Sequence, residues 1–120
     1  MRTNIYILGL LLIITGCDYV YDYSYTMTNK SDGQIKVYVK TFRIDSTFLI
    51  LKDSTKVLLI DDHGIEGSKG PYFDDVTVDL DDFKVIKNDT LISNRDYLKN
   101  DAWTYKDGDY STTVKDDEFK

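Results

Sequence analysis

Cysteine, histidine and proline are almost absent from this sequence, with one of each among 120 residues. Because Cys17 is the only cysteine, no intramolecular disulfide can form, and apolar burial and backbone hydrogen bonds must hold the fold together. Because His63 is the only histidine, a nucleophilic site would have to combine it with a serine or threonine and an aspartate. The chain also lacks a clear amphipathic helical pattern.

Positive charge is scarce as well. The chain has 15 Lys and Arg residues against 21 Asp and Glu residues, a formal net charge of −6 and a pI near 4.6. The acidic residues are spread along the chain and no basic patch is present, which argues against nucleic acid or anionic lipid headgroups as partners.

The one long apolar run lies near the start of the chain. Arg2 precedes residues 5–14, which are apolar apart from Gly9. Ten residues form roughly 15 Å of helix, whereas a spanning helix must cross roughly 30 Å of hydrocarbon. The run is therefore typical of a signal-peptide helix and is shorter than a permanent transmembrane helix requires.

A short motif ends this run. Ile14-Thr15-Gly16-Cys17 resembles the bacterial lipobox, in which a branched apolar residue and two small residues precede cysteine. The resemblance implies cleavage between Gly16 and Cys17, a diacylglyceryl thioether on Cys17, and acylation of the new N-terminus, for example by palmitate. Two or three acyl chains, at about 0.8 kcal/mol per buried methylene, would anchor the protein to a membrane. The alternatives are ordinary signal cleavage that leaves a free Cys17, or an uncleaved anchor.

The first part of the remaining chain predicts strands. In residues 19–28 tyrosine or methionine occupies every second position, and the polar Asp22, Ser24, Thr26 and Thr28 face the other way. In residues 35–40 isoleucine and valine alternate with Lys36, Tyr38 and Lys40, so we expect the two strands to form a hairpin. The short apolar runs 47–52 and 56–60 are typical of sandwich-core strands, with a buried helix as the alternative that periodicity leaves open. Residues 61–71 contain three glycines and the only proline, which predicts the longest loop.

The second part continues this pattern. Residues 72–80 alternate, with Val76, Val78 and Leu80 on one face, and Asp81-Asp82 predicts a turn before the strand 83–87. Residues 90–92 form another short run. Residues 93–101 are polar enough for a helical turn, and Asp107-Gly108-Asp109 predicts a closing hairpin of residues 102–106 and 110–115. The tail after it is either solvated or docked through Phe119.

The predicted fold is all-β. Seven to nine short strands with turns every eight to twelve residues are typical of an antiparallel β-sandwich, immunoglobulin-like or related. We therefore divide the chain into a signal peptide, residues 1–16, and one β-sandwich domain, residues 17–120.

The sequence resembles small Bacteroidota lipoproteins. The resemblance is in Cys17 followed by a tyrosine-alternating strand, in residues 73–78 (F-D-D-V-T-V) before Asp81-Asp82, and in a hairpin that joins Trp103 to residues 110–113 (Y-S-T-T). It implies a one-domain β-sandwich in the bacterial cell envelope, lipid-anchored at the outer membrane, and it implies no particular activity.

Three groups of residues are candidate sites. His63 has Asp61, Asp62 and Glu66 near it, but it is expected to be an exposed loop residue and not a catalytic one. Clustered carboxylates could bind calcium, although aspartates at turns are usually turn formers; they are Asp74, Asp75, Asp79, Asp81 and Asp82. An exposed tyrosine stripe could bind sugars or peptides, but it could equally be the core face of the first strand; it comprises Tyr19, Tyr21, Tyr23 and Tyr25.

We thus expect a non-enzymatic, membrane-anchored envelope lipoprotein with a binding or structural role, no cofactor and no metal. Its partners would be the membrane, through the lipid, and an envelope protein or glycan. The alternative is a calcium- or glycan-binding accessory module of a cell-envelope complex.

Overall fold

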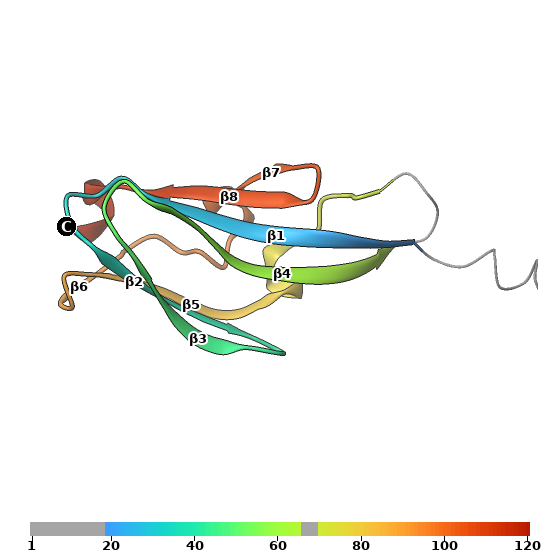
Figure 1. The fold of residues 1–120 in the computed structure, drawn as a ribbon, viewed down its shortest axis with the longest axis horizontal. Coiled ribbons are helices and arrows are strands. Elements are labelled where there is room, and N and C mark those ends of the chain that lie inside the picture. Colours follow the sequence, from blue (N-terminus) through green and yellow to red (C-terminus); the bar gives the residue numbers. More distant parts are fainter. Residues whose placement is uncertain (1–18, 66–69) are drawn as a thin grey trace, which may run out of the picture.

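The computed structural model describes residues 19–65 and 70–120, which form two four-stranded β-sheets packed face to face (Figure 1). The predicted all-β sandwich is confirmed, whereas the signal-peptide helix, Gly16 and Cys17 lie outside the described residues. The strands are β1 (Tyr19–Asn29), β2 (Ile35–Thr41), β3 (Asp45–Ile50), β4 (Thr55–Ile65), β5 (Leu80–Lys87), β6 (Leu91–Ile92), β7 (Thr104–Lys106) and β8 (Asp109–Val114). Three short 3-10 helices accompany them, η1 (Val76–Val78), η2 (Asn100–Ala102) and η3 (Asp116–Phe119).

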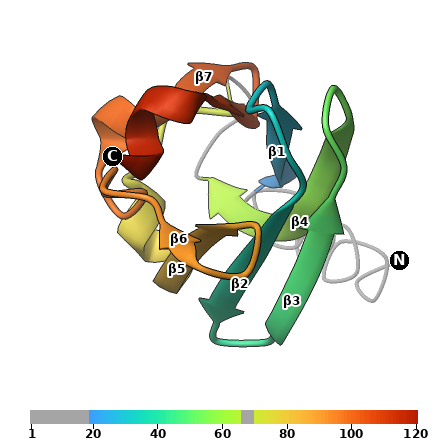
Figure 2. The same ribbon diagram turned by 90° about the vertical axis from the view of Figure 1, so that its left-hand side faces the viewer.

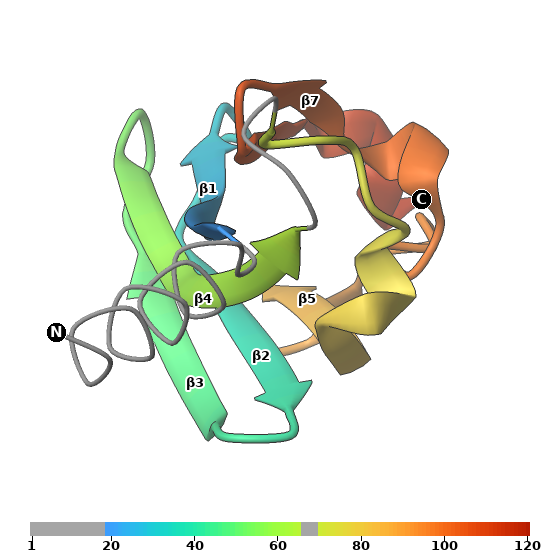
Figure 3. The same cartoon turned by 90° about the vertical axis from the view of Figure 1, so that its right-hand side faces the viewer.

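Sheet A has the strand order β4-β1-β8-β7, and sheet B has the order β3-β2-β5-β6. All neighbouring strands are antiparallel except β1 and β8, which are parallel. β3 and β4 meet along one side of the sandwich (Figure 2). On the other side, the segment that contains η1 runs between the two sheets (Figure 3).

The core consists of the inward faces of both sheets. Tyr23, Tyr25 and Met27 of β1 face Val37 and Val39 of β2, and all five are fully buried. Such alternation is expected of strands with one face on the core. Each fully buried apolar side chain contributes roughly 1.5–3 kcal/mol, so this face supplies much of the folding energy.

Aromatic rings fill the space beneath sheet A. Tyr25 stacks on Tyr110 of β8 with ring centroids 4.6 Å apart, and it packs edge-to-face with Trp103 with centroids 5.3 Å apart. Trp103 in turn packs against Phe83 of β5, so the aromatic cluster joins the two sheets.

The predicted hairpin of the first two strands is wrong, because β1 lies in sheet A and β2 in sheet B. The buried Asn29 side chain holds the crossing between the sheets: it donates to the carbonyls of Gly33 (2.8 Å) and Ile50 (3.0 Å) and accepts from Ser31. A polar turn between alternating strands fits a sheet-to-sheet crossing as well as a hairpin.

The middle of the chain differs from prediction in three ways. Residues 61–65, expected to be loop, extend β4 along β1, and Asp81-Asp82, expected to be a turn, lies within β5. Residues 72–79 do not form a strand, and Leu80 is the first residue of β5. Instead Asp75 accepts a hydrogen bond from the Thr77 amide and begins η1, so that Val76 is buried while Val78 is 64% exposed.

The two apolar runs before this region become β3 and β4, the edge strands of their sheets. Leu49, Val57 and Ile60 lie on the outward faces of these sheets and are exposed. The runs are therefore not the fully buried core strands that their composition predicts.

The C-terminal part agrees better with prediction. β7 and β8 form the expected hairpin, with Asp107 and Gly108 both at positive φ (49° and 87°), the conformation of a two-residue hairpin turn. In the polar segment 93–101, the only regular secondary structure is the start of η2 at Asn100. Phe119 of η3 is buried, which favours the docked alternative for the tail.

Candidate functional site

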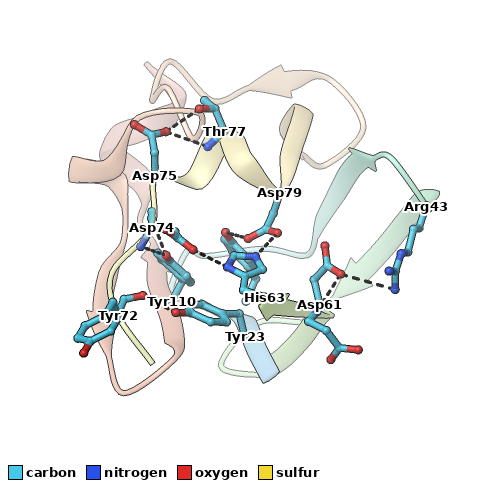
Figure 4. A network of polar contacts seen from close by, with 12 residues as sticks. Tyr23, Arg43, Asp61, His63, Tyr72, Asp74, Asp75, Thr77, Asp79 and Tyr110 are labelled. Carbon is cyan, nitrogen blue, oxygen red and sulfur yellow. Dashed lines mark hydrogen bonds and ion pairs between the residues drawn. The ribbon is translucent and has the colours of Figure 1, made fainter. Parts of the chain in front are cut away.

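The most unusual feature of the interior is a buried histidine with carboxylates around it, which we call the His63 cluster and define as Asp61, His63, Asp74 and Asp79 (Figure 4). His63 lies in β4 opposite Tyr21 of β1, and its ring stacks on Tyr23 with centroids 4.0 Å apart. The residue is only 9% exposed, so the expectation of an exposed loop histidine is wrong.

Two carboxylates bind the His63 ring from opposite sides. Nδ1 lies 2.7 Å from Oδ2 of Asp74, and Nε2 lies 2.6 Å from Oδ1 of Asp79. Both nitrogens can donate only when the imidazole is protonated. Burial lowers the pKa of His63, but hydrogen bonds and charge from Asp79 and Asp74 outweigh it and leave the pKa above its ordinary value.

Asp79 is the most deeply buried carboxylate of the cluster, at 4% exposure, and its second oxygen accepts from the Tyr25 hydroxyl at 2.6 Å. Burial raises the pKa of Asp79, and the hydrogen bonds from Tyr25 and His63 only partly oppose this effect. Burial also raises the pKa of Tyr25, so that its hydroxyl stays protonated and donates.

Two further tyrosines fix the segment that contains Asp74. The Tyr110 hydroxyl donates to the Asp74 carbonyl at 2.5 Å and accepts from the Asp74 amide at 2.9 Å, and burial raises the pKa of Tyr110 to about 12. The Tyr23 hydroxyl donates to the Tyr72 carbonyl. Sheet A thus holds this irregular segment in place beside His63.

Asp61 completes the cluster. It precedes His63 by two residues in β4, so both side chains point to the same face of the sheet. Donor atoms of Asp61, His63 and Asp79 all lie within 4.8 Å of one another. Arg43 approaches Asp61 from the other side, with Nη1 3.7 Å from Oδ1.

The five predicted calcium candidates do not converge on one point. Asp74 and Asp79 meet at His63, but Asp75 binds Thr77 and Asn100, Asp82 accepts from the Phe83 amide, and Asp81 is exposed. Calcium needs six to eight oxygen ligands, and these residues bring only two carboxylates together.

The tyrosine stripe faces inward. Tyr23 and Tyr25 are fully buried and Tyr21 is half-buried, while the side chain of Tyr19 lies outside the described residues. The burial favours the core-face alternative, and these hydroxyls serve the His63 cluster and the nearby backbone. The exposed rings of this part of the molecule are instead Tyr72 and Phe73.

The sequence gives only a weak signal for the His63 cluster. Asp74 and Asp79 are 11 and 16 residues from His63, and η1 has no strong helical pattern of its own. Asp61 and His63 are two residues apart, a spacing that places both side chains on the same face of a strand. Because the glycines of residues 61–71 predicted a loop, this spacing did not indicate a strand.

A separate cleft of about 550 Å³ lies beside the last residues of β8, 112–114, which extend beyond the paired part of β7. Arg95 lines this cleft and donates to the carbonyls of Thr113 (3.2 Å) and Ala102 (2.8 Å). Glu118 accepts from the hydroxyls of Tyr97 and Ser93. The hydrogen bonds of Arg95 satisfy backbone carbonyls at the ends of β8 and η2. A stabilising role is therefore the simplest account of the cleft residues.

The sequence matches no family model, no curated protein and no solved structure. Within the described part of the chain, no helix has the length and apolar character needed to cross a bilayer.

Proposed function

We propose that this chain is a lipid-anchored lipoprotein of the bacterial cell envelope, similar to small Bacteroidota lipoproteins, with a non-enzymatic binding or structural role at the outer membrane. The observation that carries the proposal is the sequence Ile14-Thr15-Gly16-Cys17, with the only cysteine of the chain at the position that a lipobox requires. The apolar run before it has the length of a signal-peptide helix.

The position of the first strand supports this proposal. β1 begins at Tyr19, two residues after Cys17, so an acylated Cys17 would hold the sandwich close to the membrane. The turns β2–β3 and β7–β8 point toward the end of the sandwich at which β1 begins (Figure 1). Phe42 in the β2–β3 turn is 97% exposed, and an aromatic side chain there suits a membrane interface.

A role without catalysis fits the surroundings of His63. Both ring nitrogens face carboxylates, and within residues 19–65 and 70–120 no serine, threonine or cysteine side chain hydrogen-bonds to the ring. A nucleophilic mechanism needs such a hydroxyl or thiol within reach of the base.

The test is expression of the full chain in a bacterial host that processes lipoproteins, followed by envelope fractionation and intact-mass measurement. We expect a membrane-bound product that begins at Cys17 and carries diacylglyceryl and acyl groups. The Cys17→Ser variant should carry no lipid mass and should no longer give a product that begins at residue 17. A soluble, unmodified wild-type product would overturn the proposal.

A glycan-binding accessory module of an envelope complex is the second candidate. Tyr72 and Phe73 are neighbours in sequence and about half exposed, and exposed aromatic rings are suited to sugar faces. A thermal-shift screen of the full chain against a glycan panel tests it, with calcium and chelator as parallel arms, because a ligand well above its Kd raises the Tm. A Tm that no glycan raises contradicts this candidate.

A further inference from the structure

We propose that Asp61, His63 and Asp79 form a binding site for one divalent transition metal ion of the zinc class. The donors would be Nε2 of His63 and one carboxylate oxygen from each aspartate, a set that suits Zn²⁺ and its neighbours. The inference does not depend on lipid anchoring.

The first argument is geometric. The three donor atoms already lie within 4.8 Å of one another. Ligands about 2.1 Å from a tetrahedral metal ion are separated by about 3.4 Å. Nε2 of His63 and Oδ1 of Asp79 are 2.6 Å apart, so the metal-bound arrangement requires them to separate by less than about 1 Å. Donor pairs more than about 3.4 Å apart must instead approach, by at most about 1.4 Å, so side-chain movements of this size would complete the set.

The second argument is the support behind the donors. Metal-binding histidines usually donate their other ring N–H to a carboxylate, which orients the ring and strengthens the ligand. Asp74 occupies that position, with Oδ2 2.7 Å from Nδ1, and Tyr110 fixes the Asp74 backbone. Tyr25 holds the second oxygen of Asp79. The ligands are therefore oriented before any ion arrives.

The third argument is charge. Three carboxylates surround one imidazole in a partly buried space, and Arg43 is the only other cationic side chain paired with the cluster among the described residues. Buried carboxylates need a compensating charge. A divalent ion bound at Nε2 would supply more positive charge than the proton that it replaces.

The donor set also distinguishes between metals. Calcium would require six to eight oxygens, whereas the cluster offers one nitrogen and few carboxylates in a confined space. His63 and Asp79 are nearly buried, while the side chains of Asp61 and Asp74 are 24% and 40% exposed. Solvent thus reaches the cluster past both Asp61 and Asp74, and a water beside Asp61 can complete the coordination.

The experiment uses the full chain in detergent, stripped of metal with a chelator and titrated with Zn²⁺ against a chromophoric competitor. We expect one equivalent to bind with a Kd in the micromolar range or tighter, and Co²⁺ to give a tetrahedral visible spectrum at the same site. Asp61→Asn should weaken binding at least tenfold. Asp62→Asn is the matched control, because Asp62 is the next residue of β4 and is exposed on the opposite face, and it should bind like the wild type.

Circular dichroism of each metal-free variant verifies folding, and Asp61, being partly exposed, is the substitution least disruptive to the core. Asp74→Asn tests the supporting carboxylate and should weaken binding roughly 10–100-fold. The absence of stoichiometric Zn²⁺ binding by the folded wild type would overturn the proposal. Equal affinity of Asp61→Asn and Asp62→Asn, or binding of Ca²⁺ in preference to Zn²⁺, would overturn it as well.

Discussion

The Tyr25 hydroxyl donates to Asp79 at 2.6 Å and thereby connects the central strand of sheet A to the residue that immediately precedes β5 of sheet B. Both residues are buried, at 0% and 4% exposure. The Tyr25 ring also stacks on Tyr110, so one side chain contributes both to apolar packing and to a polar link between the sheets.

Removal of this hydroxyl should therefore be costly. Tyr25→Phe keeps the ring but leaves a buried carboxylate oxygen without its donor, and we expect a loss of about 1.5–3 kcal/mol in the free energy of unfolding. Chemical denaturation measures it. Tyr21→Phe, at a half-buried position of the same strand, is the control and should change stability by less than about 0.5 kcal/mol. Equal losses for the two variants would contradict the assigned role of the hydrogen bond.

The crossing between the sheets gives a second prediction. Asn29→Ala removes the partner of two carbonyls and of the Ser31 amide and hydroxyl, all in a buried turn. We expect a loss of about 2–3 kcal/mol, seen as a lower denaturation midpoint at unchanged slope. The exposed Asn94 provides the control variant Asn94→Ala, which should behave like the wild type.

Two glycines give a matched pair. Gly108 has φ of +87°, and a Cβ there would lie 3.0 Å from the Asp22 carbonyl, so Gly108→Ala should lower the free energy of unfolding by about 1–2 kcal/mol. A Cβ at Gly64 would meet nothing within 4 Å, and Gly64→Ala should change stability by no more than about 0.5 kcal/mol. Thermal unfolding of both variants compares them, and a larger loss at Gly64 would contradict the turn geometry.

Acid should weaken the attachment of η3. Asp116 accepts from Lys87 Nζ at 2.9 Å and from the Asp32 amide, and these bonds lower the pKa of Asp116 below its ordinary 3.8. A lowered folded-state pKa means that the contribution to stability is complete above the unfolded pKa and is lost as the pH falls through the folded value.

We therefore expect Asp116→Asn to be less stable than the wild type at neutral pH, and the difference to shrink as the pH falls below about 4. Denaturation curves across this pH range measure it. Asp117→Asn, at the neighbouring exposed position, should follow the wild-type profile. A difference that grows on acidification would contradict the ion pair with Lys87.

Local patterns in the sequence predicted the parts of this fold that local interactions determine. The alternation of Tyr21, Tyr23 and Tyr25 indicated β1 and its buried face, and Asp107-Gly108 indicated the β7–β8 turn, because these signals depend only on adjacent residues. The choice of neighbouring strand is different. Nothing between Asn29 and Gln34 distinguishes a hairpin from a crossing between sheets, because the crossing is held by a hydrogen bond from Asn29 to the carbonyl of the distant Ile50.

The His63 cluster was unpredictable for a similar reason. Asp79 resembles a turn aspartate in the sequence, and only η1, begun by the Asp75 side chain, turns it inward toward His63. Val78 shows the same effect, because strand alternation assigned it to the face of Val76 whereas the 3-10 turn exposes it. A three-residue helix is too short to leave a periodic pattern.

The position of β1 between β4 and the parallel β8 has a mechanical consequence. A pull on a tether at residue 17 acts along the length of β1, which pairs with β4 over residues 19–28 and with β8 over residues 24–29. Such a force loads the hydrogen bonds of two ladders in shear, so they do not break one at a time. At the end of an edge strand, by contrast, the same force opens a single ladder bond by bond. The strand nearest the proposed anchor is thus the one that is best placed to bear load.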